Sequence, residues 1–244
     1  MVNFVVNGMW GARTESLQRI GERWAETFSG LDEIDDECLR GWREDAGPRS
    51  TSPELPSLSA PALAEYVERG NRDPDDPYIG YTESLETMKP NSPLVRLSIH
   101  AGGQSVWVTN SVALSFKSRV VDEDSVRAVR HGQEILRIIA EAWDIDGGQV
   151  YRRSEYNAVK EEFGLAAPDP RCGRAVYLSA NRAALAPEGL PGIYTRTAHG
   201  GLIIDLTHGG TQDPGIETIL DVNRKLRAAG ALEPLATPYQ RDKW

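Results

Sequence analysis

The chain has 244 residues, of which 40% are hydrophobic and 26% are charged, and its formal net charge at pH 7 is −9. This balance is typical of a folded globular protein and excludes a chain too polar to bury a core. No run of about 18 apolar residues is present, which excludes a membrane span. The acidic charge argues against a protein that binds the phosphate backbone of nucleic acid.

The first residues lack the basic segment and the long apolar segment of a signal peptide, so we expect a cytoplasmic protein. The two cysteines, Cys38 and Cys172, lie far apart in the sequence. Without an export signal we expect them to be reduced thiols rather than a disulfide. Neither has metal-ligand spacing to another cysteine or to a histidine, and we expect no metal and no cofactor.

The first third of the chain predicts one strand and two helices. Residues 4–8 are apolar and β-branched and end at a glycine, which is typical of a strand. A helix follows over residues 14–31, with Thr14 placed as its N-cap and apolar residues at helical spacing. A proline- and serine-rich loop over residues 48–56 separates it from a second helix over residues 59–70.

The middle of the chain predicts three strands and the longest helix. The strands cover residues 78–85, 94–100 and 106–116, and the last two are joined into an antiparallel hairpin by Gly102-Gly103. A helix over residues 122–143 begins with three acidic residues, which the positive end of the helix dipole favours.

The last third alternates short strands and helices. Residues 144–148 form a turn, and the elements after it are separated by glycines and prolines. Strands are predicted over 149–151, 175–179, 193–197 and 202–207, and helices over 154–164 and 213–230.

Together these elements predict an α+β fold with mostly antiparallel sheet packed by a few amphipathic helices, because sequential strands form hairpins and strict βαβ alternation is missing. We expect a single domain over residues 1–232, with an internal break near residue 147 as the alternative. Residues 233–244, which contain two prolines and four charges, predict an extended or disordered tail.

Several short motifs follow one another along the chain, beginning with Trp-Gly-x-Arg-x-Glu-Ser at its start. They occupy residues 10–16, 108–114, 142–147, 154–156, 174–179, 200–207 and 213–214. In order and spacing they resemble the immunity protein 52 family, whose members neutralise toxins of bacterial polymorphic toxin systems.

The resemblance implies an α+β intracellular inhibitor that is encoded beside its toxin. The implied partner is a cognate toxin domain, often a DNase of the restriction-endonuclease type, rather than nucleic acid or a membrane. The resemblance implies no catalytic residue set. The acidic, proline-containing region over residues 32–77 matches none of the motifs.

Six residues of these motifs are interpreted as structural. Large aromatic residues at the junctions of elements are usually buried in the core, and an asparagine before a strand satisfies local backbone groups. Arg13 and Glu15 are expected to be too close on the first helix to face each other. The six residues are Trp10, Arg13, Glu15, Asn110, Trp143 and Tyr156.

Two acidic clusters are the predicted toxin-binding residues. Carboxylates can imitate phosphates and pair with lysines or arginines of a nuclease, and an acidic surface accelerates encounter with a basic one. The alternative is that these residues form an ordinary solvated surface. The clusters comprise Asp32, Glu33, Asp35, Asp36, Glu37, Asp73, Asp75 and Asp76.

Two other function classes are alternatives to an inhibitor. A small hydrolase could use His199 or His208, each followed by two glycines, near Asp205, or Cys172 as a thiol nucleophile. No Gly-x-Ser-x-Gly nucleophile motif occurs, and we expect no catalytic residues. The other alternative is an interaction module without a toxin partner.

A cation site would need several carboxylates in one place. Asp144 and Asp146 could chelate a cation together with Asp122 or Asp124. Carboxylates beside glycines more often form turns or cap helices, so we predict no metal site.

Overall fold

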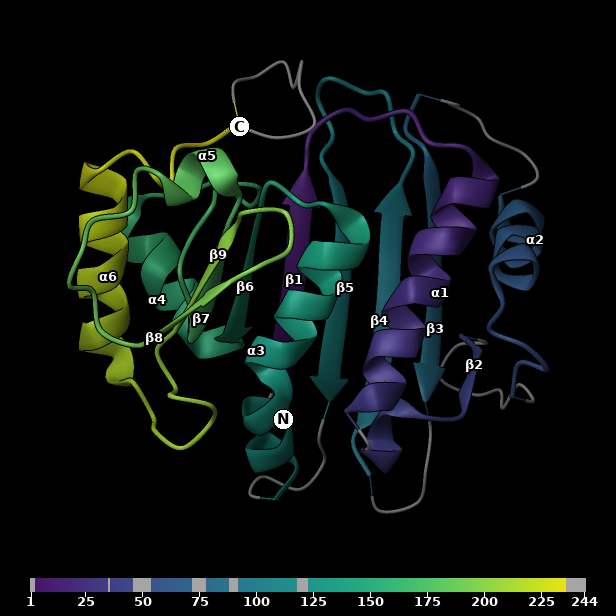
Figure 1. The fold of residues 1–244 in the computed structure, drawn as a ribbon, viewed down its shortest axis with the longest axis horizontal. Helices are drawn as coiled ribbons and strands as arrows, with labels where there is room; N and C mark the ends of the chain where they lie inside the picture. Colours follow the sequence, from purple (N-terminus) through teal and green to yellow (C-terminus); the bar gives the residue numbers. More distant parts are fainter. Residues whose placement is uncertain are drawn as a thin grey trace.

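The computed structural model describes residues 3–34, 36–45, 54–71, 78–87, 92–117 and 123–235. Within them nine strands form one antiparallel sheet in the order β2-β3-β4-β5-β1-β6-β7-β9-β8 (Figure 1). The strands are β1 (Asn3–Trp10), β2 (Trp42–Glu44), β3 (Tyr81–Thr87), β4 (Leu94–Ala101), β5 (Asn110–Lys117), β6 (Gly147–Arg152), β7 (Ala175–Leu178), β8 (Ile193–Arg196) and β9 (Leu202–Asp205).

Helices lie on both sides of this sheet. They are α1 (Leu17–Glu33), α2 (Ala60–Gly70), α3 (Glu123–Trp143), α4 (Arg153–Phe163), α5 (Ala180–Ala183) and α6 (Gly215–Ala228), with a short 3-10 helix η1 (Glu37–Leu39). The predicted α+β class with a mostly antiparallel sheet is confirmed. No helix of the described residues is long and apolar enough to cross a membrane.

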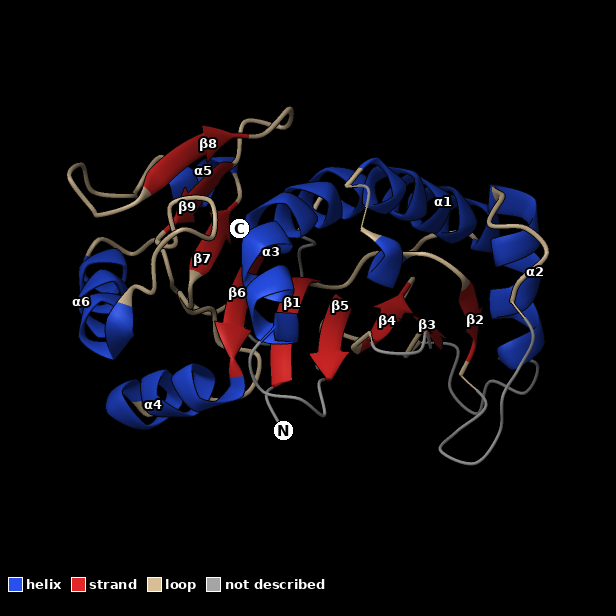
Figure 2. Cartoon of the chain, turned by 90° about the horizontal axis from the view of Figure 1, so that it is seen from below, coloured by secondary structure: helices blue, strands red, loops and turns tan. Residues whose placement is uncertain are grey.

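The larger core lies between the sheet and helices α1 and α3. Alternate residues of β4 and β5 are buried, as expected of strands with one packed face. Figure 2 shows α1 and α3 covering this face. The register places Val6 of β1 between Leu114 of β5 and Val150 of β6, so that all three contribute to the same core.

A second core lies on the opposite face, over the C-terminal strands. Val176 and Leu178 of β7 and Ile204 of β9 pack there with Ile219 and Val222 of α6. Figure 2 shows α4 on the side of the sheet opposite α1 and α3. Strands β7 and β9 are therefore buried on both faces, which explains why their sequences are continuously apolar.

The sheet continues through residue 147, the position of the alternative internal break in the domain. Strand β6 begins at Gly147 and pairs with β1 from Met9↔Gly147 to Phe4↔Arg152. Of the predicted tail, only residues 233–235 are described. The Leu235 side chain is buried, and the Glu233 carbonyl accepts a hydrogen bond from Arg182 at 2.7 Å.

Several predicted element boundaries are wrong; strand β3, for example, covers Tyr81–Thr87 rather than residues 78–85. Helix α1 begins at Leu17, and its N-cap is Ser16, whose hydroxyl accepts from the Arg19 amide at 3.2 Å, rather than Thr14. Strand β5 begins at Asn110 rather than at residue 106, because its partner β1 ends at Trp10, opposite Asn110. The β4–β5 hairpin itself is antiparallel, as predicted, but residues 102–109 connect the two strands.

Candidate functional site

The two tryptophans of the family-like motifs lie together in the larger core. The Trp10 and Trp143 rings are stacked with their centroids 5.7 Å apart, and neither residue is exposed. The Trp143 indole donates to the Thr27 hydroxyl of α1 at 2.9 Å. This contact joins α1, α3 and β1, so both tryptophans have a structural role.

Arg13 and Glu15 precede α1 and hold the C-terminal end of α3. Arg13 donates to the carbonyls of Trp143 at 2.7 Å and Asp144 at 3.1 Å, which lack partners within the helix. Contrary to the prediction, Arg13 and Glu15 also pair with each other at 3.4 Å. They can do so because the chain is not yet helical at these positions. Glu15 also pairs with Arg23 at 2.6 Å.

The remaining two motif residues organise local structure. Asn110 is buried; its side chain accepts from the Gly103 amide at 2.9 Å and donates to the Gly11 carbonyl at 2.6 Å. Tyr156 lies on the other side of the sheet against Tyr151, and the Arg171 guanidinium lies 4.1 Å from its ring centroid. Burial lowers the pKa of Arg171.

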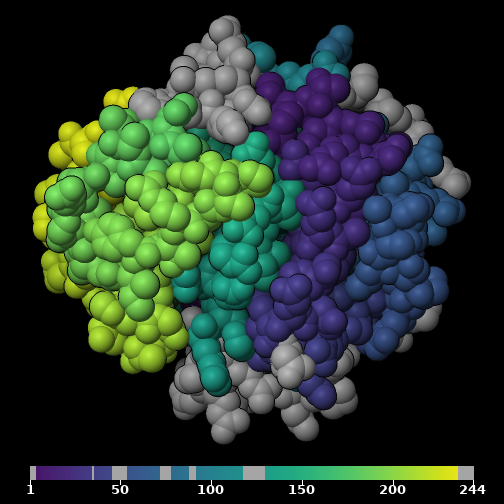
Figure 3. Space-filling view, viewed as in Figure 1, coloured from purple at the N-terminus to yellow at the C-terminus, as the bar shows by residue number. Residues whose placement is uncertain are grey.

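The first acidic cluster lies at the C-terminal end of α1 and in η1. Figure 3 shows this face of the molecule, with α1 in purple beside α3 in teal. Asp32, Glu33 and Glu37 are exposed, and Asp32 pairs with Arg40 at 2.9 Å. We name these three carboxylates the acidic end. Asp35 and the second cluster, Asp73, Asp75 and Asp76, lie outside the described residues.

Asp36 has a structural role that the sequence did not indicate. Its carboxylate accepts from the Cys38 amide at 2.9 Å as the N-cap of η1, and it lies 3.4 Å from the His131 imidazole of α3. Both contacts turn Asp36 toward the protein. It is therefore a poor candidate for toxin contact and a poor position for a charge reversal.

The geometry does not assemble the hydrolase alternative from His199, His208 and Asp205. The two histidines lie beyond opposite ends of β9, because His199 precedes this strand and His208 follows it. The Asp205 carboxylate accepts from the Thr207 amide and hydroxyl at 2.9 and 2.6 Å and from the Gly209 amide at 2.6 Å. The Gly209 amide, which an oxyanion hole would need as a donor, is therefore already bonded to Asp205.

Cys172 is fully buried and its sulfur donates to the Gly173 carbonyl at 3.3 Å. Burial raises the pKa of the Cys172 thiol, which opposes formation of a nucleophilic thiolate. The Asn223 side chain accepts from the Cys172 amide at 2.9 Å and donates to the Cys172 carbonyl at 2.7 Å. The surroundings are those of a structural thiol.

We predict that both thiols are inert in the folded protein. Cys38 and Cys172 are both buried and free, so an aromatic disulfide reagent should modify neither until the chain is unfolded in guanidinium chloride. Spectrophotometric titration should then count two thiols per chain, and one in the Cys38→Ala variant. Rapid modification of Cys172 in the native protein would instead support the thiol-nucleophile alternative.

The cation hypothesis has no support among the described residues, in which no group of three or more potential ligands is found. Asp146 is fully buried and pairs with Arg182, which donates two hydrogen bonds of 3.0 and 2.8 Å to the same carboxylate oxygen. The Asp144 carbonyl accepts from Arg13. Asp122 lies outside the described residues, as does the side chain of Asp124.

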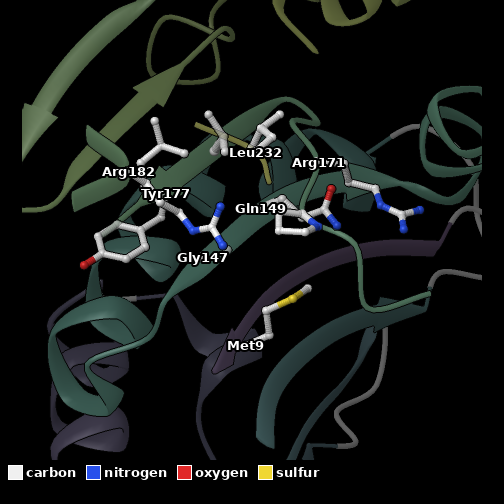
Figure 4. A pocket seen from close by; sticks show the side chains of 11 residues that line it. Met9, Gly147, Gln149, Arg171, Tyr177, Arg182 and Leu232 are labelled. Atoms are coloured by element: carbon white, nitrogen blue, oxygen red, sulfur yellow. The ribbon is translucent and has the colours of Figure 1, made fainter. Parts of the chain in front are cut away.

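A small cavity lies between β1, β6, β7 and the segment after α6 (Figure 4). Met9, Gln149, Tyr177, Arg182 and Leu232 are among the residues that line it. Its size suits a single water molecule, and the buried side-chain oxygen Oε1 of Gln149, which has no hydrogen-bond partner among the described residues, could accept from one. We assign it no substrate.

One surface was missed by the sequence reasoning. Tyr78, Ile79, Trp107 and Val108 expose 62%, 42%, 70% and 38% of their surfaces, and they lie on two hydrogen-bonded loops at one end of the sheet. We name them the Trp107 patch. The sequence placed all four residues in strands, and no local pattern distinguishes an apolar loop from the end of an apolar strand.

Comparisons with known proteins place the chain by its fold. No model of a protein family matches the sequence, and no curated protein matches it either. Among solved structures, a similar one is the Pseudomonas aeruginosa T6SS protein PA0821, with a TM-score of 0.52 and 12% sequence identity. The match covers 97% of this chain and 74% of that one. At this identity the likeness is one of fold.

Proposed function

We propose that the chain is an immunity protein that binds a cognate bacterial toxin, a nuclease-type effector, and neutralises it by forming a stoichiometric complex. The motifs that resemble the immunity protein 52 family support this proposal. So does the fold, since a structurally similar protein is a T6SS protein, which fits a role in bacterial competition. The inhibitor would act in the cytoplasm, without catalysis, metal or cofactor.

The observation that carries the proposal is the acidic end of α1 on a chain with a net charge of −9. A nuclease presents lysines and arginines to the phosphates of its substrate, so the surface that binds the substrate is basic. At a distance, opposite charges raise the association rate and favour the correct orientation. An acidic binder therefore suits a basic toxin better than a neutral one.

Co-expression with the protein encoded by the adjacent gene tests the function directly. That protein alone should arrest growth, and the present chain should restore growth and co-purify with it in a fixed ratio. If the neighbouring protein is toxic but is neither bound nor neutralised, the immunity proposal is wrong. A harmless neighbour that does not bind would favour an interaction module without a toxin.

Reversing two charges of the acidic end should slow association with the toxin. The variant Glu33→Lys with Glu37→Lys is expected to lower the association rate constant about tenfold at low salt, because it removes attraction at a distance. The dissociation rate should change little, and the difference should shrink as salt is added. Surface-plasmon resonance at two salt concentrations measures both rates.

The matched control reverses two exposed charges on the other side of the sheet. Glu161→Lys with Glu162→Lys, on α4, changes the net charge by the same amount. Equal slowing by both pairs would show that only net charge matters. Unchanged rates in the Glu33 and Glu37 variant would exclude the acidic end as the steering surface. Asp36 is left intact because its substitution would remove the cap of η1.

A further inference from the structure

We propose that the Trp107 patch is the anchor that holds the partner of the proposed function, and that it inserts into an apolar pocket bordered by basic side chains on the toxin. This inference rests on the proposed function, because it names the surface through which that function is exercised. Two surfaces then have different roles. The acidic end raises the association rate, and the Trp107 patch makes the contact that slows dissociation.

The patch is held by hydrogen bonds between its two loops. The amides of Gln104 and Ser105 both donate to the Tyr78 carbonyl at 2.8 Å, and the His100 imidazole is 2.7 Å from the Ile79 carbonyl. A binding surface that is ordered beforehand loses less conformational entropy when its partner arrives. These bonds hold Tyr78, Ile79 and the first part of the 102–109 loop, and the Trp107 amide donates in turn to the Ser105 hydroxyl at 3.2 Å.

Asn110 connects this platform to the rest of the fold. Its amide group bridges Gly103 in the β4–β5 loop and Gly11 after β1, and the Arg13 amide donates to the Gly103 carbonyl at 2.9 Å. The position of Asn110 in the family-like motif then has a physical reason. The asparagine positions the loop that carries Trp107.

Exposure of these apolar side chains to water is unfavourable in the isolated protein. Their burial against a partner would be favourable. Of the eight large hydrophobic residues exposed in the described part of the chain, four belong to this patch. Clustered exposed apolar residues mark interaction sites, and tryptophan and tyrosine are enriched among the residues that dominate binding energy. Trp107 and Tyr78, the two most exposed of the eight, fit this role.

Charge decides which kind of protein covers the patch. A second copy of this chain would also carry a net charge of −9, so that long-range repulsion opposes self-association. A basic protein is attracted instead. Because interface cores are depleted of charged residues, the basic groups of such a partner belong around the pocket rather than within it.

The patch and the acidic end lie at opposite ends of α1. Gly102, in the patch loop, lies against Glu15 and Ile20 at the start of α1, and the acidic end begins at Asp32. The helix has 17 residues, which at 1.5 Å per residue separates its ends by about 25 Å. An interface of ordinary size, about 800 Å² on each partner, is centred on one of them and reaches the other only at its margin.

The test measures binding of the full-length chain to the toxin protein encoded by the adjacent gene. Trp107→Ala is expected to weaken the complex by about 30-fold, mainly through faster dissociation, because tryptophan anchors dominate interfaces. The matched control is Tyr194→Ala, which removes an aromatic side chain that is 42% exposed on β8. This control should bind as the wild type does.

A second pair of variants tests the basic border and does not depend on removing a large side chain. Val108→Lys and Val108→Glu introduce charges of opposite sign at the same exposed position. The lysine variant should dissociate faster than the glutamate variant. The reverse order would contradict a basic border on the toxin pocket.

The remaining outcomes separate the two proposals. Wild-type binding and growth rescue, with Trp107→Ala equal to the wild type, would overturn the anchor and leave the immunity function standing. Loss of binding in Tyr194→Ala but not in Trp107→Ala would move the interface to β8. A wild-type chain that neither binds nor protects would remove the proposed function and this inference with it.

Discussion

Replacing Asp146 with alanine is expected to lower the free energy of unfolding by about 3–5 kcal/mol, because the Arg182 guanidinium would be left buried without its counter-charge. Both side chains are completely buried, and the two hydrogen bonds of 3.0 and 2.8 Å join the turn after α3 to α5. Arg182 also donates to the carbonyls of Ala231 and Glu233 at 3.1 and 2.7 Å. Urea denaturation followed by circular dichroism measures the change.

The double variant Asp146→Leu with Arg182→Met distinguishes a broken ion pair from a simple loss of packing. Removing both charges should destabilise the protein less than Asp146→Ala alone, because no unpaired charge stays buried. If Asp146→Leu and Arg182→Met are additive in the double-mutant cycle, Asp146 and Arg182 do not act as a pair and the prediction is wrong.

Replacing Trp143 with alanine is expected to cost about 3–5 kcal/mol, because it removes a fully buried indole from the centre of the larger core. The cavity would lie between α1, α3 and β1, where the ring stacks on Trp10 at 5.7 Å. The Thr27 hydroxyl would also lose the hydrogen bond that the indole donates. The measurement is the urea midpoint together with the slope of the transition.

Trp107→Ala is the matched control for this prediction, since it removes the same side chain from an exposed loop. It should change the free energy of unfolding by about 0.5 kcal/mol or less. The two tryptophans therefore have opposite expected profiles, with Trp143 affecting stability and Trp107 affecting binding. A large loss of stability in Trp107→Ala would argue that this ring packs against the protein rather than against a partner.

Asp36 is a poor position at which to test the acidic hypothesis. As one of a run of carboxylates, Asp36 looked equivalent to its neighbours, but it caps η1 and faces His131. Reversing its charge would change folding and binding together. Glu33 and Glu37 are exposed, so their substitution addresses binding with less effect on the fold.

The α+β class and most of the regular elements follow from local patterns in the sequence. Strands β4 and β5 show alternating burial, and α1 buries Ile20, Trp24, Phe28 and Leu31 at helical spacing. Such periods are set by backbone geometry within a single segment, so they can be read without knowing what the segment packs against. The short elements η1, β2 and α5 span too few residues to show a period, and they were missed.

Which residues are exposed and which are paired depends on the tertiary structure. Arg13 bonds to the carbonyl of Asp144, which follows α3 and lies 131 residues away in the sequence. Strand β5 begins at Asn110, opposite the last residue of β1, and this leaves Trp107 in an exposed loop. Exposure and charge pairing depend on which distant segments share a surface. Local spacing does not encode this, because hydrophobic burial and ion pairing respond to neighbours in space rather than to neighbours in the chain.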